Sequence, residues 1–265
     1  MFTIKEINRR IVEDFEYLTY DLNMNVVGVF LQGSQNYHLD YKGSDIDTKA
    51  IIIPKFEDIV LNKKPISKTL IKEDDSHLDV KDIRLMFDCF KKQNINFLEI
   101  LFTEYNFIHV AYYDAFKPML DNAEKIAHYN NYAAVNCLAG MVYEKYKALE
   151  HPYPTIKDKI EKYGYDPKQL HHILRCEEFM TRYVEGIPYK ECLIPEDPIH
   201  LINVKKGCYN LEEVRFLAKE SQEYVKSFKK DYMENNPCII DNEVVEIMNK
   251  VLIDIFKISF KGDLL

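Results

Sequence analysis

The first element that the pattern of apolar and polar positions predicts is a helix over residues 4–20. Charged side chains separate apolar ones that recur every three or four residues, namely Ile4, Ile7, Ile11, Phe15 and Leu18. This spacing puts the apolar side chains on one face of an α-helix. Residues 26–33 and 48–54 are instead short runs of apolar, mostly β-branched residues, each ended by a Gly or a Pro. They predict two buried strands joined by a long polar loop.

After the second strand the pattern predicts one more strand region and then helices. Residues 68–80 form the third strand region, and residues 83–94 form a helix for which Asp82 is placed as the N-cap. Strand signals fade after Tyr105, and helical spacing takes over in residues 123–150, 168–186, 211–232 and 242–259. The order predicts a protein of α+β class, with a break between its halves near Tyr105 to Pro118. Two proline-rich stretches of the second half, residues 151–167 and 186–200, predict ordered but irregular connectors.

Composition and charge narrow the classes of protein. A chain of 265 residues with 47% hydrophobic content is long enough for one large domain or two modest ones. The formal net charge of -8 and the pI near 5.6 argue against a long nucleic-acid track but allow a local basic pocket. The start, MFTIKEINRR, has charges where a signal peptide needs apolar residues, and no apolar run approaches the roughly eighteen residues of a membrane span. We therefore expect a cytoplasmic protein without a membrane partner.

A pair of acidic residues at the start of the second strand carries the first candidate chemistry. Residues two apart in a strand share a face, so Asp45 and Asp47 in S-D-I-D project the same way. Two carboxylates so placed suit a divalent cation, Mg²⁺ or Mn²⁺, that also binds phosphate. Gly33 and Ser34 end the preceding strand and can offer backbone N–H groups and a hydroxyl to phosphate oxygens. The alternative for S-D-x-D is turn chemistry or a helix cap.

A third carboxylate has two candidates in the stretch S-H-L-D-V-K-D. Asp79 has an apolar residue on either side, as expected of a strand residue that faces a metal, whereas Asp82 stands where the following helix needs its cap. We favour Asp79 as the third catalytic and metal-binding carboxylate. His77 shares the face of Asp79, and its alternative is a solvated position at the strand end.

The order of strand, glycine-serine pair, loop, D-x-D strand and third acidic strand resembles the nucleotidyltransferases of the DNA polymerase beta superfamily. The resemblance implies a polymerase-beta-like nucleotidyltransferase domain, with a small mixed sheet and flanking helices, followed by a helical domain. We place the first domain at residues 1–110 and the second at residues 111–265. The resemblance also implies that Asp45, Asp47 and Asp79 hold Mg²⁺ or Mn²⁺ and are the catalytic residues.

Longer motifs resemble a narrower family, the predicted nucleotidyltransferases associated with RNA ligases in bacteria and phages. The matching stretches lie between Gly28 and Val225 and read G-S-x-x-Y, S-D-I-D, KKQNINFLEILF, KQLHHILRCEEFMTRYVEG and LINVKKGCYNLEEV. The chain departs from the family at two positions. His38 stands where the family has a glycine, and Lys49 stands roughly where it has an arginine.

The same resemblance supplies candidates for nucleotide binding. Lys168, His172 and Arg175 lie at i, i+4 and i+7 of one helix, in the family's K-x-x-x-H-x-x-R arrangement, and can hold a triphosphate tail. A solvated basic face, or a core histidine, is the alternative. Tyr37 and His38 lie in the phosphate loop, where Tyr37 can stack on a base and His38 can contact the nucleotide or narrow the pocket.

The function that the resemblance implies is metal-dependent transfer of a nucleoside monophosphate from an NTP, such as ATP, to an acceptor, with release of pyrophosphate. The sequence leaves the acceptor open between an RNA end, a protein and a small molecule. The alternative from another class is a nucleotide-binding regulatory or defence-associated protein with a drifted, weakly active site. His38 favours this alternative, and the complete set of three carboxylates opposes it.

Overall fold

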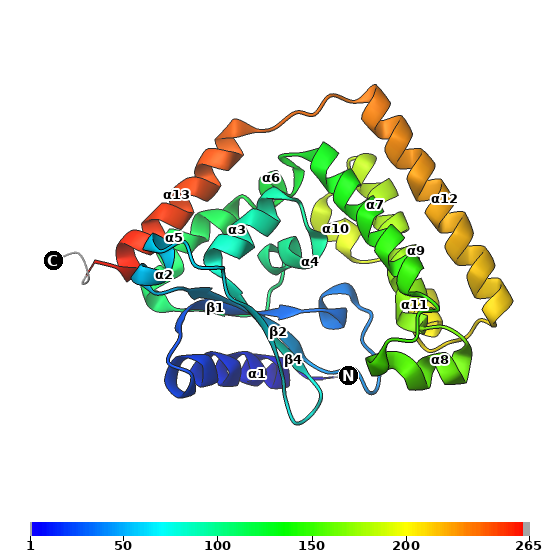
Figure 1. The fold of residues 1–265 in the computed structure, drawn as a ribbon. Helices are drawn as coiled ribbons and strands as arrows, with labels where there is room; N and C mark the ends of the chain where they lie inside the picture. The colour runs from blue at the N-terminus through cyan, green and yellow to red at the C-terminus, as the bar shows by residue number, and fades with distance from the viewer. Residues whose placement is uncertain (1, 262–265) are drawn as a thin grey trace. The chain divides into compact units, whose positions relative to one another are not determined.

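The computed structural model describes residues 2–261, which form two compact units, each described here by itself (Figure 1). Unit 1 consists of residues 2–36, 41–129 and 240–261, and unit 2 consists of residues 37–40 and 130–239. The last helix, α13 (Asn242–Ser259), belongs to unit 1, where it packs on α5 (Val110–Asp121).

These compact units are not divided where the sequence analysis places its boundary. Residues 111–129 pack within unit 1, and the chain returns to unit 1 at residue 240. The predicted domains, residues 1–110 and 111–265, were defined by function as well as by packing. Their boundary stays a prediction.

Unit 1 is built on a mixed sheet that has five strands within residues 2–261. The strand order is β3-β4-β2-β1-β5, and the strands are β1 (Asn25–Gln32), β2 (Asp47–Ile53), β3 (Ser67–Ile71), β4 (His77–Asp82) and β5 (Asn106–Ile108). β1 runs antiparallel to both β2 and β5, β2 is parallel to β4, and β3 is antiparallel to β4. A mixed sheet with flanking helices, followed by a largely helical stretch, confirms the predicted α+β class.

The central strands are buried, and most of their residues are apolar. In β1 every residue of the stretch 26–31 is buried. One face of the sheet packs on α1 (Ile4–Glu16), which begins at a capping box between Thr3 and Glu6 and continues into a π-helical turn. The predicted apolar stripe of this helix lies in that core, with Ile7, Ile11, Phe15 and Leu18 all buried. Predicting this helix from its periodicity was therefore correct.

Short helices complete unit 1. They are α2 (Phe56–Val60), α3 (Ile83–Lys91), α4 (Ile95–Leu98), the 3₁₀ turn Glu99–Leu101 and α6 (Ala123–His128). The carboxylate of Asp82 accepts a hydrogen bond of 2.9 Å from the backbone N–H of Arg84 and so caps α3. The capping role predicted for Asp82 is confirmed.

The strand prediction was wrong in two places. Residues 68–80 are two strands and not one, because a turn in which the Ser76 carbonyl accepts the Lys72 N–H folds β3 back along β4. The short strand β5 was missed altogether. It is an edge strand of three residues, and it approaches β1 closely at Gly28, where a Cβ atom would lie 2.9 Å from the Phe107 carbonyl oxygen. Only a glycine admits the neighbouring backbone at that distance.

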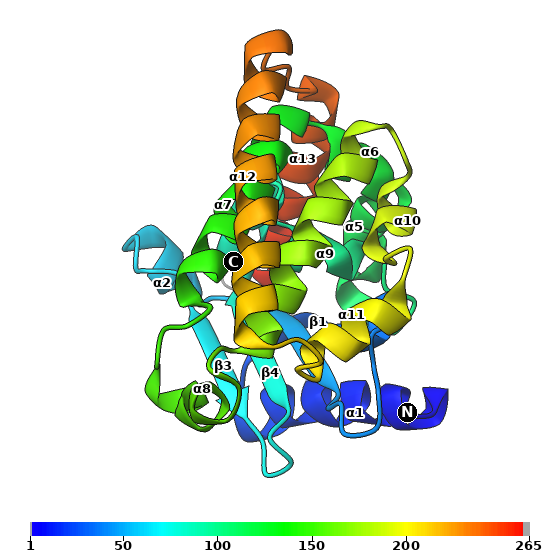
Figure 2. The same ribbon diagram turned by 90° about the vertical axis from the view of Figure 1, so that its right-hand side faces the viewer.

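Unit 2 is helical. Its long helices are α7 (Asn131–Ala148), α9 (Pro167–Val184) and α12 (Leu211–Asn235), and its shorter ones are α8 (Lys157–Tyr163), α10 (Tyr189–Leu193) and α11 (Pro198–Lys205). The three long helices pack against one another (Figure 2).

The two predicted irregular connectors are largely helical in the structure, so that expectation was wrong. The stretch 151–167 contains α8, and the stretch 186–200 contains α10 and the start of α11. Prolines caused the error, because Pro167 and Pro198 occupy the first positions of helices, where a missing N–H costs nothing. Within residues 2–261, none of the helices is both long enough and apolar enough to cross a membrane.

Candidate functional site

The glycine-serine turn and the acidic pair meet at one end of the sheet. Gln32 of β1 pairs with Asp47 of β2, so Gly33 follows β1 at the level where the D-x-D strand begins. Gly33 has φ +90°, a left-handed conformation that favours glycine, and a Cβ atom there would lie 3.8 Å from Asp47 Oδ2. Ser34 then opens a 3₁₀ turn, Ser34–Tyr37. Gly33 therefore adds no side chain on its side of the Asp47 carboxylate.

Asp45 and Asp47 lie together with a third side chain, His77. One ligand atom of each residue lies within 4.8 Å of the others, and all three side chains are half-buried. Among residues 2–261 this is the group of acidic, histidine and cysteine side chains that is placed to hold one ion. Two carboxylates and an imidazole are a donor set that divalent cations accept, so the residues fit the metal that the sequence analysis expects.

Opposing effects act on the pKa of the Asp47 carboxyl. Burial raises its pKa, and the neighbouring Asp45 carboxylate raises it further. The backbone N–H of His77, which donates a hydrogen bond of 2.8 Å to Asp47 Oδ1, acts in the opposite direction. His77 Nδ1 lies 3.3 Å from the same oxygen. A cation bound between the two aspartates would remove the repulsion that raises this pKa.

Side-chain amides hold the loop in front of the acidic pair. Gln35 Nε2 donates a hydrogen bond of 2.6 Å to the carbonyl oxygen of Asp45. Asn36 Nδ2 donates one of 3.0 Å to the carbonyl oxygen of Leu31, and Asn36 Oδ1 accepts one of 2.8 Å from the Thr103 hydroxyl. The position of Asp45, which precedes β2, is therefore fixed by the turn that follows Gly33.

Asp79, the predicted third carboxylate, is engaged elsewhere. Its oxygens lie 2.7 Å from Lys81 Nζ, 2.9 Å from the Thr69 hydroxyl and 3.9 Å from Lys49 Nζ. The group that the structure brings together on Asp45 and Asp47 contains His77 in its place. Sequence analysis placed His77 on the same face as Asp79 but did not select it for this group.

Lys49, which stands where the family has an arginine, is a buried cation. Its ammonium group donates to the Asn96 carbonyl oxygen and lies 4.2 Å from the centre of the Phe97 ring. Burial lowers the pKa of Lys49, Asp79 opposes the shift and the charge of Lys81 adds to it, and the net result is a pKa of about 8. Lys49 is therefore tied to the sheet and to α4, and the structure places it beside Asp79.

The predicted basic stripe on α9 divides into three different environments. Lys168 is exposed, Arg175 is 7% exposed, and His172 is half-buried. The Arg175 guanidinium carbon lies 3.6 Å from the centre of the Tyr37 ring, so two of the predicted nucleotide-binding residues stack within unit 2. Burial, reinforced by the charges around His171 and Arg175, lowers the pKa of His172 well below its usual range. His172 is neutral at pH 7.

His38 has an unusual backbone conformation. Its φ is +57°, in the left-handed region, and its side chain is exposed. A glycine at this position in the family that the motifs resemble has a physical reason, because glycine adopts that conformation without strain. Histidine is among the side chains that tolerate it better than most.

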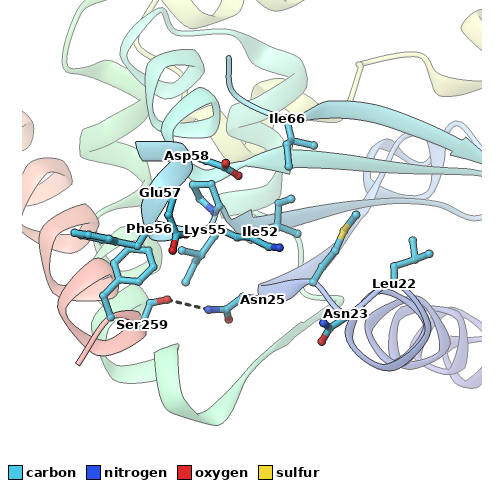
Figure 3. A pocket seen from close by; sticks show the side chains of 14 residues that line it. Leu22, Asn23, Asn25, Ile52, Lys55, Phe56, Glu57, Asp58, Ile66 and Ser259 are labelled. Atoms are coloured by element: carbon cyan, nitrogen blue, oxygen red, sulfur yellow. Dashed lines mark hydrogen bonds between the residues drawn. The ribbon is translucent and has the colours of Figure 1, made fainter. Parts of the chain in front are cut away.

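A cavity of about 490 Å³ lies at the opposite end of the sheet (Figure 3). It is lined by the start of β1, the end of β2, α2 and the end of α13, where Asn25 Nδ2 donates a hydrogen bond of 2.9 Å to the Ser259 hydroxyl. The strand from Asn25 to Gln32 separates it from the acidic pair by roughly 20 Å at about 3.3 Å per residue. None of the predicted site residues lines this cavity.

Comparison with known proteins gives a distant structural likeness. No family model and no curated protein match the sequence. Among solved structures, the chain is similar to a nucleotidyltransferase-like protein from Exiguobacterium sibiricum 255-15, with 12% sequence identity over 86% of this chain and 76% of that chain and a TM-score of 0.30. A TM-score this low does not identify a shared site, and the function is inferred below from the residues themselves.

Proposed function

We propose that the protein is a metal-dependent nucleotidyltransferase that moves a nucleoside monophosphate from an NTP to an acceptor and releases pyrophosphate. The observation that carries the proposal is the position of Gly33, a left-handed turn without a side chain, directly beside Asp47 and at the end of the sheet that also holds Asp45. A phosphate group and a divalent cation need these two features side by side.

In the proposed reaction, a hydroxyl oxygen of the acceptor attacks the α-phosphorus. The bond between the α-phosphorus and the bridging oxygen breaks, and pyrophosphate leaves with the electron pair. The proton of the hydroxyl goes to a base, for which Asp79 is the proposed residue once it releases the Lys81 ammonium or the Thr69 hydroxyl. Asp45 and Asp47 hold the cation, which supplies positive charge to the phosphates when it is bound. The backbone N–H of Ser34 and its hydroxyl bind phosphate oxygens beside Gly33.

Five further residues are proposed ligands of the nucleotide, namely Tyr37, His38, Lys168, His172 and Arg175. The stacking of Arg175 on Tyr37 supports a shared role for these two. Since His172 is neutral at pH 7, we assign to it a hydrogen bond and not an ionic contact with the phosphates. Lys168 is exposed and is the proposed point charge for the end of the triphosphate.

The test is a labelling experiment with each of the four NTPs carrying ³²P at the α-phosphate. The purified protein is incubated with Mn²⁺ or Mg²⁺ and with RNA, protein and small-molecule fractions of a cell extract in turn. Transfer predicts label in one fraction together with an equal amount of pyrophosphate, and no label with Asp47→Asn. A protein that binds NTP in the presence of metal yet forms neither product would be the nucleotide-binding regulator instead.

A further inference from the structure

The register between β2 and β4 decides which side chain lies level with the acidic pair. The two strands are parallel, with Thr48 opposite Leu78 and Lys49 opposite Asp79. One step earlier on both strands, Asp47 lies next to His77, as the hydrogen bond from the His77 N–H to Asp47 Oδ1 demonstrates. The sheet therefore has two adjacent rows, one of Asp47 and His77 and one of Lys49 and Asp79.

In the row of Lys49 and Asp79, protein groups already satisfy the Asp79 carboxylate without a metal. Asp79 receives the Lys81 ammonium and the Thr69 hydroxyl at hydrogen-bond distance, and a second ammonium, that of Lys49, at 3.9 Å. To bind an ion beside Asp47, Asp79 would have to give up two charge-assisted or polar bonds. His77 has no such cost, because its ring already faces the Asp47 carboxylate.

The geometry of His77 suits a ligand atom. Its Nδ1 lies 3.3 Å from Asp47 Oδ1. Two neighbouring ligands of an octahedral ion, each about 2.1 Å from the metal, are roughly 3 Å apart, so the nitrogen and the oxygen are already spaced for one ion. The side chain is 42% exposed, which leaves the ring able to adjust.

We infer that His77 is the third protein ligand of the metal centre and that the centre consequently prefers first-row transition ions over Mg²⁺, with Mn²⁺ as the ion that tests this preference. This inference rests on the proposed function for the identity of the site and deepens it. Mg²⁺ is bound mainly by oxygen ligands, whereas imidazole nitrogen suits first-row transition ions, whose affinity for such a site rises from Mn²⁺ toward Cu²⁺. Two carboxylates and one imidazole leave further positions of the ion open for phosphate oxygens.

The test measures ion binding in the absence of nucleotide. Free Mn²⁺ is quantified by its electron paramagnetic resonance signal, and Mg²⁺ is measured by competition. We expect the wild type to bind Mn²⁺ at least about tenfold more tightly than Mg²⁺, and pulsed spectra of bound Mn²⁺ to show coupling to one imidazole nitrogen. His77→Asp, which supplies a carboxylate instead, should lose that coupling and reduce the preference for Mn²⁺ about tenfold.

Two matched variants complete the experiment. Asp79→Asn should keep both the nitrogen coupling and the preference for Mn²⁺, because Asp79 is not a ligand. His151→Asp makes the same chemical change at an exposed histidine of unit 2 and should leave both unchanged. Should His77→Asp not fold, the nitrogen coupling in the wild type decides alone.

The inference and the proposed function fail in different ways. Bound Mn²⁺ without nitrogen coupling, or an Asp79→Asn variant that loses as much affinity as His77→Asp, would overturn the role of His77 even if transfer of label is observed. Nitrogen coupling in a protein that transfers label from none of the NTPs would keep the metal centre and overturn the transferase.

Discussion

The acidic pair at the start of β2, which was predicted from strand spacing, and the basic stripe on α9, which was predicted from a family resemblance, have different structures. Asp45 and Asp47 lie, half-buried, within one group of side chains that could hold a metal ion. The three residues of the stripe share a helix but not an environment, since Lys168 is exposed and Arg175 is covered by Tyr37. A strand with a period of two fixes the face of each side chain almost completely. On a helix the spacing fixes the direction, and packing decides whether a charge is available to a ligand.

The difference makes the acidic pair the place where a single change should have the largest effect. Asp47→Asn and Asp45→Asn are each expected to lower the transfer rate by a factor of about 100 or more, because a carboxylate that binds the cation is lost. The measurement is the rate of label transfer at saturating NTP and Mn²⁺. Near-normal turnover in either variant would remove the metal from the mechanism.

The direction of the change in stability can also be predicted for Asp47→Asn. The folded-state pKa of Asp47 is raised by burial, so the folded protein holds this proton more strongly than the unfolded chain does. The charged carboxylate therefore costs stability at neutral pH, and the cost disappears as the pH falls through the range of the carboxyl. Without metal, Asp47→Asn should melt at or above the wild-type temperature at pH 7, and this advantage should shrink toward pH 4.

Lys49 offers a second test on the same face of β2, because it is a buried charge whose partners are all protein groups. Its folded-state pKa, about 8, lies below the ordinary value of 10.5, so the wild-type unfolding free energy should rise with pH between those values. Lys49→Met has no such group. The stability of this variant relative to wild type should therefore fall by roughly 3 kcal/mol between pH 7 and pH 10.5, at about 1.4 kcal/mol per pKa unit. Urea denaturation at both pH values measures the difference, and a constant difference would contradict the buried charge.

Mutations in the basic stripe should have different effects on the unfolding free energy. Arg175→Ala removes a buried guanidinium that stacks on Tyr37 and is expected to lower the unfolding free energy by about 2 kcal/mol. Lys168→Ala changes an exposed side chain and should stay within about 0.5 kcal/mol of the wild type. Both variants should weaken the binding of NTP more than that of NMP, because the proposed partners of these side chains are the β and γ phosphates.

Arg175→Lys is the matched control for the stripe. It keeps the charge and loses the planar group that lies on the Tyr37 ring. If NTP affinity follows the charge alone, this variant binds like the wild type and the stacking is structural. Equal losses of NTP and NMP affinity in Arg175→Ala, Lys168→Ala and Arg175→Lys would mean that the stripe stabilises the fold and does not bind the β and γ phosphates.

Strand patterns in the sequence predicted Asp47 at the start of β2, but neither the loop contact that holds Asp45 nor the third side chain beside this pair. The period of two put His77 and Asp79 on one face, and the structure agrees. Which of them lies level with Asp47 depends on the register between β2 and β4, and a shift of two residues changes the partner while every side chain keeps its face. Register is set by the pairing of whole strands and by the β3–β4 hairpin. The six residues of β4 alone do not determine either.

The helical half shows a different limit of sequence patterns. Helical spacing correctly predicted α7, α9, α12 and α13, whose apolar stripes are long. The same spacing could not show that Arg175 is covered, because Tyr37 reaches it from a segment more than a hundred residues earlier in the chain. Prolines in the connectors were interpreted as helix breakers, although Pro198 with the Asp197 cap marks a helix start.

We expect the smallest change in stability at His38. The same position distinguishes the active enzyme from the nucleotide-binding regulator. Its φ of +57° strains a side chain by about 1 kcal/mol, and His38→Gly relieves that strain. The glycine also gives the unfolded chain more freedom, which costs about 0.5–1 kcal/mol, so the net change in unfolding free energy should be a gain of no more than a few tenths of a kcal/mol. Asn23→Gly, at φ +49° and outside the proposed site, is the control for this balance. We expect the transfer rate of His38→Gly to stay near that of the wild type, because the backbone conformation is sufficient reason for a glycine in the family that the motifs resemble. A large gain in transfer would mean that the imidazole blocks the phosphate loop, and it would favour the drifted regulator over an active enzyme.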